Sequence, residues 1–502
     1  MRISSTALVG LLLLELFKSN GVRADNVTLY GGPTYSSSTS TGYRDPTLPF
    51  LPGNSVANGG TAVGRATKFD AGVDQGLRAV RWDGTASPAV ELGNLGFSSQ
   101  GTTVTGVYGV NSAGTAVGNA AKYDSGIDRG FRAVRWNASG TAATELNSLE
   151  STSFGYSFGL AYAVNDANTA VGVSFAFDDN DQQIGSRPIR WDGTGTVATE
   201  LGNLGLATAG GSFPAGYTTG EAVVVNQAGT AAGHVEKFAG GSSLGNHAVR
   251  WDSTGTAATE LESLGFSSSG NTEAHVTGIN GADTVVGFIR KFEAGSDVGY
   301  RAVRWDGGGI AATELGNLGV NPSGPTSTLA YALNNAGTAV GTAEKFEAGL
   351  NVGSRAVRWD GLGTAATELG NLGVSLGGFT SSVARAVNEA GAAVGWSQAY
   401  DGLGTDLGQR AVYWGLDNVA IDLNTLVDPL SGWSNLTDAF DLSDDGWITG
   451  LGTFDPDGAG GDAPYDRMFL LNIQQVPEPS SSLLALCGVV GISHLARRRA
   501  SC

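Results

Sequence analysis

The sequence predicts an all-β fold built from about eight copies of one four-stranded unit, and three observations carry this prediction. A strand that ends in tryptophan recurs seven times, with successive spacings of 54, 55, 60, 54, 54 and 55 residues. Gly makes up 78 of the 502 residues, which indicates many turns and few long helices. Apolar residues within the repeat do not recur with a helical period. Repeats of this length are typical of propellers, solenoids and other arrays.

Each unit begins with a β-hairpin, typified by AYALNNAGTAVG over residues 330–341. Alternating small and apolar residues flank an Asn-x-Ala-Gly turn, in which glycine supplies the positive φ. A loop such as KFEAGSDVG follows, then the RAVRW strand, a glycine turn and a short last strand such as AATELGNLG, residues 311–319. We expect the repeated tryptophans to pack between units. They are Trp82, Trp136, Trp191, Trp251, Trp305, Trp359 and Trp414.

The number of hairpins predicts the number of blades. Eight hairpins end at Gly64, Gly118, Gly172, Gly233, Gly287, Gly341, Gly395 and Gly450. The eighth unit has no ELGNLG strand, whereas the segment NVTLYGG, residues 26–32, has strand composition and belongs to no unit. In a ring this segment supplies the missing strand and removes an open edge. The prediction is a β-propeller of about eight four-stranded blades, seven full repeats plus a closing blade, with a linear β-solenoid as the alternative.

The two ends of the chain predict export. Residues 1–24 have a positive start at Arg2, an apolar segment and the small-residue pattern Val-Arg-Ala, which indicates a secretory signal peptide. Both cysteines, Cys487 and Cys502, lie in the tail, so the body, residues 25–475, contains no disulfide and no thiol nucleophile. A formal charge of −18 argues against nucleic acid and anionic lipid as partners.

The tail, residues 476–502, combines a proline spacer, a short apolar run and an arginine cluster. As a helix, the run would span roughly 23 Å, less than the ~30 Å core of a bilayer. The arrangement resembles the PEP-CTERM sorting signal. That resemblance implies transient contact of this hydrophobic transmembrane helix with a bacterial inner membrane, and cleavage by an exosortase at the Pro-Glu-Pro site. A permanent tail anchor is the alternative. The residues of the motif are Val476, Pro477, Glu478, Pro479, Arg497, Arg498 and Arg499.

From about residue 55 to residue 471, the repeat resembles the HAF-type extracellular repeat. The shared features are an (H/R)-A-(F/V)-x-W strand, an acidic-Leu-Gly-x-Leu-Gly strand and an Asn-x-x-Gly-x-x-x-Gly hairpin. Arg takes the first position in most units, and His247 is the exception. The resemblance implies an exported protein of the cell surface or extracellular matrix, in a family known mainly for exported proteins of undefined activity.

Charged and aromatic residues outside this framework are candidates for a site. Arg and Glu recur at fixed offsets, first as Arg78, Arg81 and Glu91, either as a ring of anion sites or as structural pairs. Recurrence in every unit favours the structural interpretation. Three tryptophans break the register and either stack on a glycan or fill gaps around the closing blade: Trp396, Trp433 and Trp447. The loop DPDGAGGD offers a weak calcium site or a solvated acidic turn, with Asp455, Asp457 and Asp462; no other cofactor is expected.

No catalytic site is predicted. The stretch of residues 155–159 matches the nucleophile motif G-x-S-x-G, but another repeat hairpin follows it instead of a helix. His234, His247 and His275 have no metal-ligand spacing. The sequence therefore predicts an exported non-catalytic repeat protein processed by an exosortase-type enzyme. The alternatives are a propeller that binds a glycan or exopolysaccharide, and a hydrolase or lyase.

Overall fold

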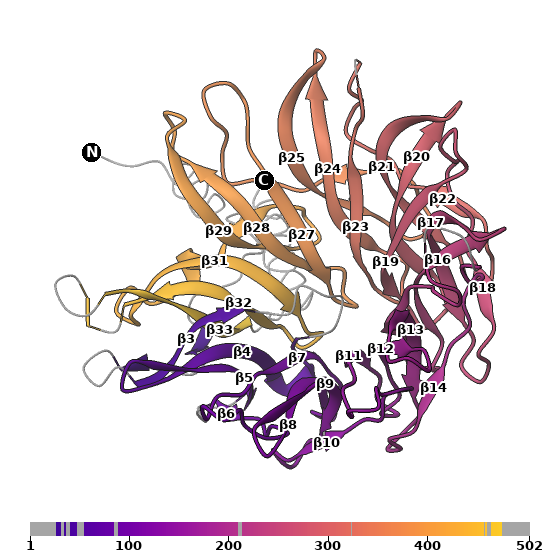
Figure 1. Cartoon of the computed structure of the whole chain (residues 1–502). Helices are drawn as coiled ribbons and strands as arrows, with labels where there is room; N and C mark the ends of the chain where they lie inside the picture. Colours follow the sequence, from indigo (N-terminus) through magenta and orange to yellow (C-terminus); the bar gives the residue numbers. More distant parts are fainter. Residues whose placement is uncertain are drawn as a thin grey trace, which may run out of the picture.

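The computed structural model describes residues 27–31, 35–36, 41–47, 55–84, 89–208, 213–322, 324–455, 457–458 and 463–473. Its strands form eight antiparallel blades arranged radially in a ring, in the order of the chain (Figure 1). The protein is therefore an all-β propeller, as predicted. In each of blades 2–7 the first strand lies innermost and the fourth outermost. Blades 4 and 5 are additionally joined by a short parallel pairing of β17 (Ser242–Trp251) with β19 (Thr272–Ile279).

Blades 2–7 share one four-stranded plan. Their strands are β7 (Thr105–Val110), β8 (Ala116–Asp124), β9 (Ile127–Trp136) and β10 (Ala143–Glu145); β11 (Gly159–Val164), β12 (Ala170–Phe177), β13 (Gln183–Trp191) and β14 (Ala198–Glu200); β15 (Gly220–Val225), β16 (Ala231–Ala239), β17 (Ser242–Trp251) and β18 (Ala258–Glu260); β19 (Thr272–Ile279), β20 (Val285–Glu293), β21 (Ser296–Trp305) and β22 (Ala312–Glu314); β23 (Thr328–Leu333), β24 (Ala339–Glu347), β25 (Leu350–Trp359) and β26 (Thr367–Glu368); β27 (Ser382–Val387), β28 (Ala393–Tyr400), β29 (Asp406–Trp414) and β30 (Ala420–Asp422).

Blade 8 closes the ring with a strand from the other end of the chain. It consists of β31 (Trp433–Leu442), β32 (Trp447–Phe454), β33 (Tyr465–Ile473) and, outermost, β1 (Val27–Gly31). β1 runs antiparallel to β33, with Leu29 opposite Leu471. The closure predicted from the missing eighth strand is thus confirmed, and the linear solenoid is excluded.

Blade 1 departs from the repeat and was not fully predicted. It contains β2 (Tyr35–Ser36), β3 (Thr41–Thr47), β4 (Thr61–Asp70), β5 (Val73–Asp83) and β6 (Val90–Glu91), and β3 pairs with β4 where other blades have their inner strand. The β3–β4 register shifts between Arg44 and Thr47. Pro46 lies in this irregularity, where a residue without a backbone N–H disturbs the ladder least. Two 3-10 turns complete the described elements, η2 (Asn58–Gly60) and η3 (Leu423–Leu426).

A bulge marks the inner strand of each of blades 2–7, always at the same place. In blade 6 the register shifts between Ala330 and Ala332, so that Tyr331 is the extra residue. The glycine that ends the hairpin permits this approach of the two strands, because a Cβ on Gly341 would lie 1.9 Å from the carbonyl oxygen of Leu329. Bulges redirect a side chain. The bulged position is therefore a variable one, and in blades 5–7 its residue, Thr277, Tyr331 or Arg385, lines the central cavity.

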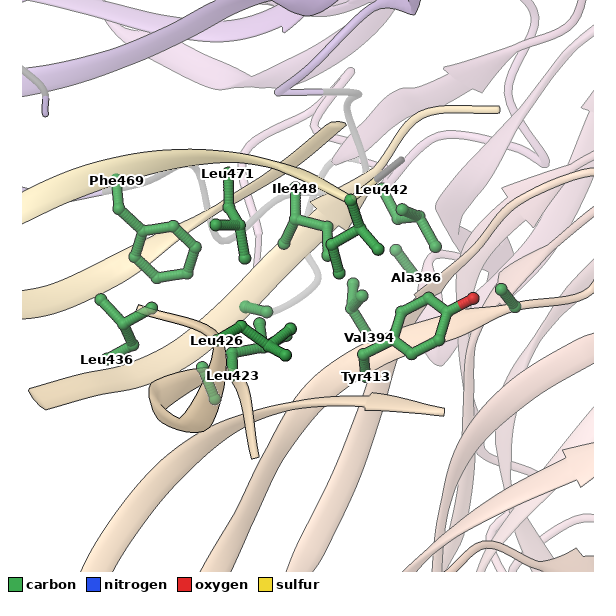
Figure 2. Close-up of a cluster of buried hydrophobic side chains, with 14 of the residues drawn as sticks. Ala386, Val394, Tyr413, Leu423, Leu426, Leu436, Leu442, Ile448, Phe469 and Leu471 are labelled. Carbon is green, nitrogen blue, oxygen red and sulfur yellow. The ribbon is translucent and has the colours of Figure 1, made fainter. Parts of the chain in front are cut away.

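The hydrophobic core lies between the blades. In the described part of the chain, buried apolar side chains form eight clusters, one at each interface between neighbouring blades. The seven repeated tryptophans are all at most 2% exposed, as their recurrence predicts. The largest cluster joins blades 7 and 8 and includes Phe469, Leu471 and Tyr413 (Figure 2).

Candidate functional site

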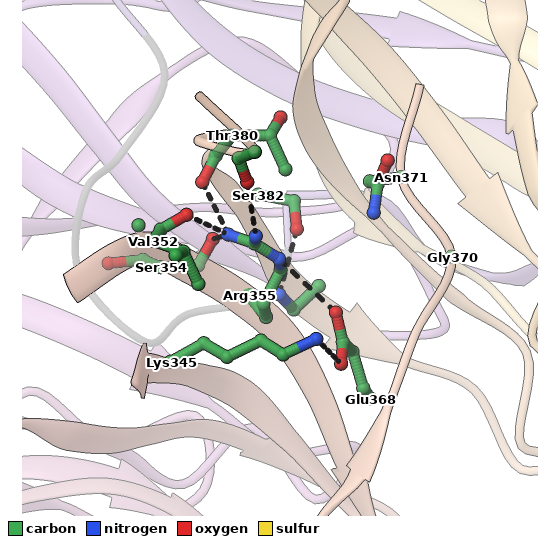
Figure 3. Close-up of polar contacts among 12 residues, drawn as sticks. Lys345, Val352, Ser354, Arg355, Glu368, Gly370, Asn371, Thr380 and Ser382 are labelled. Atoms are coloured by element: carbon green, nitrogen blue, oxygen red, sulfur yellow. Dashed lines mark hydrogen bonds and ion pairs between the residues drawn. The ribbon is translucent and has the colours of Figure 1, made fainter. Parts of the chain in front are cut away.

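The repeated arginine of the tryptophan strand is a structural residue. In blade 6, Arg355 Nη1 donates to the carbonyl oxygen of Thr380 in the next blade at 2.5 Å, and its Nε lies 3.2 Å from Glu368 (Figure 3). Lys345 holds the same carboxylate at 2.9 Å. Arginine pairs with the outer-strand glutamate in the same way in blades 1, 2, 3 and 5. In blade 4, His247 replaces it, 2.8 Å from Glu260. These contacts agree with the structural interpretation of the repeated Arg and Glu.

The second repeated arginine and the tryptophan also form hydrogen bonds between neighbouring blades. Arg304 donates to the carbonyl oxygens of Gly361, Leu362 and Gly363 in the next blade at 2.9–3.0 Å. In the opposite direction, Trp359 Nε1 donates to the carbonyl oxygen of Gly316 in the preceding blade at 2.9 Å. The same indole bond occurs in five further blades, at Trp136, Trp191, Trp251, Trp305 and Trp414.

Asparagines link the blades around the channel. Asn334 Nδ2 donates to the carbonyl oxygen of Asn388 at 2.9 Å, and the same bond runs from each blade to the next between blades 2 and 7. The residues that follow these positions, all exposed, form what we call the mouth ring. Backbone N–H groups of this ring bind side chains of the next blade, as Glu389 does to Asp444. The mouth ring is Asn58, Ser112, Asp166, Gln227, Gly281, Asn335, Glu389 and Asp444.

Behind the mouth ring lies a central cavity of about 670 Å³. An aliphatic collar surrounds it, with one residue from each blade: Val56, Val110, Val164, Val225, Ile279, Leu333, Val387 and Leu442. Blades 6–8 add an aromatic sector to its wall, defined by Tyr331, Arg385, Trp396 and Phe440, all partly exposed. Tyr331, Arg385 and Phe440 occupy bulged positions of their inner strands. A cavity of this size, which combines apolar side chains with directed polar groups, suits a small ligand.

The three tryptophans outside the register have different surroundings. Trp396 lies on β28 and lines the cavity. Trp433 is 9% exposed and packs edge-on against Phe454 and Phe469. Trp447 is 8% exposed and packs in the cluster between blades 8 and 1. Trp433 and Trp447 therefore fill gaps around the closing blade, and only Trp396 remains placed for a ligand.

Two carboxyl groups lie beside the aromatic sector, in blade 8. Asp438 forms an ion pair with Arg385 at 2.8 Å, and Asp441 accepts hydrogen bonds from the backbone N–H groups of Ser55 at 2.7 Å and Val56 at 3.0 Å. Burial raises the pKa of each to about 6, and the bonds to Arg385 and to the backbone offset only part of this rise. The two bonds from the backbone of Ser55 and Val56 to Asp441 join blade 8 to blade 1.

Histidines from two blades meet on the opposite side of the channel, which the sequence analysis missed. The rings of His234 and His275 lie 5.2 Å apart. His234 contacts Glu221 at 3.0 Å, and Tyr162 donates to the same carboxylate at 2.8 Å. Burial and the charge of His234 lower the pKa of His275. The hairpin register could have predicted this contact. His234 directly follows Gly233, and His275 lies twelve residues before Gly287; these two positions lie on adjacent inner walls.

The remaining predicted features are placed as follows. Asp455 accepts a hydrogen bond from the N–H of Gly458 at 2.9 Å, Asp457 is exposed, and Asp462 lies outside the described residues. Within the described part, no three His, Cys, Asp or Glu side chains are grouped to hold a metal ion. Ser157, in the G-x-S-x-G match, is 1% exposed, and its carbonyl oxygen accepts a bond from Arg132.

Both predicted targeting segments, residues 1–24 and 476–502, including the sorting motif, lie outside the described residues. In the part that is described, no helix is long and apolar enough to cross a membrane.

No family model and no curated protein matches the chain. Solved structures do show similarity. The β-propeller domain of the Trilobed protease from Pyrococcus furiosus is 9% identical, with a TM-score of 0.41 over 80% of this chain and 99% of that one. The GH74 xyloglucanase from Xanthomonas campestris is 10% identical, with a TM-score of 0.40 over 89% and 68%. Identities this low say nothing about shared activity, and the fold is assigned from the sheets of the chain itself.

Proposed function

We propose that the chain is an exported, non-catalytic repeat protein of the cell surface or extracellular matrix, in which a rigid ring serves as a scaffold. One observation carries the proposal: the charged side chains that recur in the units are engaged in contacts between blades. Arg355 and Lys345 both bind Glu368, and Arg355 also donates to the carbonyl oxygen of Thr380 in the next blade. Groups held this way position the blades and have little freedom to act on a substrate.

Export and processing rest on the two ends of the sequence. Residues 1–24 direct the chain out of the cytoplasm, and the proline spacer, apolar run and arginine cluster of residues 476–502 lead it to an exosortase-type enzyme. Cleavage at Pro477-Glu478-Pro479 removes Cys487 and Cys502. The mature surface protein then contains no cysteine.

The mass of the protein isolated from the cell surface tests this processing. We expect a chain that lacks both the signal peptide and the residues after the Pro-Glu-Pro site. A mass that retains Arg497, Arg498 and Arg499 means a permanent anchor instead. Replacing Pro477 and Pro479 by Ala should leave the uncut precursor in the membrane fraction, while Pro429→Ala, in the body, serves as the matched control.

Incubation of the body, residues 25–475, with polysaccharides tests the non-catalytic role. We expect neither new reducing ends nor unsaturated sugar products. Release of either product would overturn the proposal in favour of a hydrolase or lyase. His275→Ala would then show whether the histidine cluster is responsible. Binding of a glycan without cleavage is the second candidate function, and the position of Trp396 in the cavity wall favours it.

A further inference from the structure

Trp396 differs from the other nine tryptophans of the chain in its exposure, and from six of them in the bonding of its indole N–H. The other nine are at most 9% exposed, whereas Trp396 is partly exposed in the cavity wall. Six of the repeated tryptophans donate their indole N–H to a carbonyl oxygen, as Trp359 does to Gly316 at 2.9 Å. Trp396 makes no such bond to any described residue. A partly buried indole with an unused donor is suited to a ligand that supplies both an apolar face and an acceptor.

The neighbours of Trp396 supply further groups of the same kind. Tyr331 lines the same cavity, and its hydroxyl has no partner among the described residues. Burial raises the pKa of Tyr331, so the phenol stays neutral and can donate. The aliphatic collar, from Val56 to Leu442 around the ring, adds apolar surface to the wall. Small-ligand sites combine such apolar walls with a few directed polar groups.

The charges around the cavity disfavour anionic ligands. The mouth ring contains the exposed carboxylates of Asp166, Glu389 and Asp444, and the whole chain has a formal charge of −18, so phosphate and sulfate groups are repelled. The Phe440 ring is not open to a cationic ligand, because the Arg385 guanidinium already lies over it, 4.9 Å from its centre. Asp438 neutralises that guanidinium at 2.8 Å. The chemistry that remains is a neutral ring with one apolar face and several hydroxyl groups.

We propose that the central cavity binds one neutral sugar ring, stacked on Trp396 and hydrogen-bonded to its indole N–H and to the hydroxyl of Tyr331. A cavity of about 670 Å³ is large enough for a sugar ring, either a free monosaccharide or the end of a chain. The inference deepens the glycan-binding candidate and is independent of the scaffold role, since a ring can hold blades together with or without a sugar in its channel.

Quenching of tryptophan fluorescence by acrylamide tests the site, because Trp396 alone of the ten tryptophans is open to the quencher. We expect one accessible component, which disappears in Trp396→Val. Valine at this position suits the blade, because Val173 occupies the equivalent place in blade 3. Neutral monosaccharides, tested one by one with the body, residues 25–475, should protect the accessible component.

Calorimetry with the protecting sugar then separates the possible outcomes. Trp396 supplies the stacking face of the proposed site, so Trp396→Val should weaken binding about tenfold or more. Phe288→Val, the equivalent position in blade 5 and away from the cavity, is the matched control and should bind as the unmodified protein does. The melting temperature of both variants shows whether they are folded.

Three results would overturn the inference. One is that no neutral sugar protects Trp396 at any accessible concentration. Another is that choline or inorganic phosphate protects it while sugars do not, which would reassign the ligand class. The third is an unchanged affinity in a folded Trp396→Val, which would place the sugar elsewhere. None of these results bears on cleavage of the tail or on the absence of hydrolysis.

Discussion

The interfaces among blades 1–7 and the two interfaces of blade 8 are built from different interactions. Between blades 6 and 7, the described residues include an arginine bond to Thr380, an indole bond to Gly370 and a core of seven buried residues. Between blades 7 and 8, fifteen buried apolar residues form the core, part of which is drawn in Figure 2. Tyr413 stands where other blades have the second arginine. At the last interface, Trp82 has no partner for its indole N–H among the described residues.

The difference shows how a repeat ring can close after its sequence pattern erodes. Arginine and indole bonds need the partner carbonyl at a fixed place, so they require the repeat register in both blades. Apolar burial has no such directional requirement. Blade 8 has lost the register, and it is held by large side chains such as Phe469, by the carboxyl group of Asp441 and by β1. Five changes test this contrast, beginning with the largest expected effect.

Loss of β1 should have the largest effect. Replacing Val27–Gly31 by a glycine-serine segment of equal length removes five paired positions and exposes the edge of β33. We expect the cooperative melting transition to broaden or disappear, together with aggregation, as measured by calorimetry and light scattering. The same replacement of β30, an outer strand that pairs at three positions in blade 7, should cost much less. Equal losses of stability in the two variants would mean that the closing strand contributes no more than an ordinary outer strand.

A cross-link gives an independent check on this closure. Leu29 and Leu471 are opposite each other in an antiparallel pair, where Cα atoms lie about 4.5–5.5 Å apart. Disulfides form within about 7 Å. With Cys487 and Cys502 replaced by Ser, Leu29→Cys with Leu471→Cys should cross-link, and Leu29→Cys with Leu369→Cys, in blade 6, should not.

Truncation in the core of the blade 7–8 interface should have the next largest effect. Phe469 is 0% exposed, and its replacement by Ala should reduce the free energy of unfolding by about 3–5 kcal/mol. Val412→Ala, in the smaller core between blades 6 and 7, removes two methyl groups and should cost about 2 kcal/mol. Denaturant titration measures both. A larger loss for Val412→Ala would contradict the view that blade 8 depends most on apolar burial.

The buried carboxyl groups of blade 8 predict a dependence of stability on pH. Asp438 and Asp441 have pKa values of about 6 in the folded chain, against about 3.9 when unfolded, so the folded state binds more protons between these values. Stability therefore falls as pH rises from about 4 to above 6, by at most about 3 kcal/mol per group. Asp441→Asn should flatten this slope, seen as melting temperature against pH.

The histidines change stability with pH in the opposite direction. The pH slope of Asp441→Asn must therefore be compared with that of the unmodified protein. Burial lowers the pKa values of His247 and His275, so the folded chain loses stability as pH falls below their unfolded value of about 6.5. Asp441→Asn leaves this contribution in place. An identical slope in Asp441→Asn and the unmodified protein would mean that Asp441 is ionised throughout the range.

An arginine of the repeated interfaces should be the fourth most sensitive position. Arg355→Ala removes the bond to Thr380 and leaves Glu368 with Lys345 alone, at an expected cost of about 1–3 kcal/mol. Arg355→His should cost less, because His247 occupies that position in blade 4. Arg410→Ala should cost under about 0.5 kcal/mol, since among the described residues this arginine of blade 7 bonds only to the adjacent carbonyl of Gln409. Equal losses would remove the distinction between the two kinds of interface.

The repeat predicts most of the fold, because tertiary contacts in a ring follow from register. The eight hairpin glycines predict eight blades, and the missing eighth strand predicts the role of residues 26–32. The additional strands β2 and β3 were not predicted, since they match no repeat. β3 pairs with β4 and β2 with β3, without a repeat pattern of their own.

The cavity is harder to predict than the fold, because its distinctive residues occupy variable positions. The bulged residues range from Val223 to Arg385 and Phe440, so no motif marks them. Trp396 was singled out because it breaks the register, but so were Trp433 and Trp447, which are buried. Sequence identifies an unusual side chain. Whether it faces the core or the channel depends on the packing of two neighbouring blades.

Calcium should have the smallest effect, and it too follows the contrast between blade 8 and the others. In blade 6 the equivalent strands are joined by a tight turn, with Ala348 at φ 50° and Gly349 at φ 80°. In blade 8 a longer acidic loop joins β32 to β33, and within it the described carboxylates are Asp455 and Asp457. With so few ligands, a Kd near 1 mM is expected, as for weak extracellular sites. At about 1 mM calcium the gain is then about 0.4 kcal/mol. Melting curves with calcium and with EDTA should nearly coincide, and Asp455→Asn with Asp462→Asn should change neither. A shift of several degrees that this double variant abolishes would identify a metal ligand set in the closing blade.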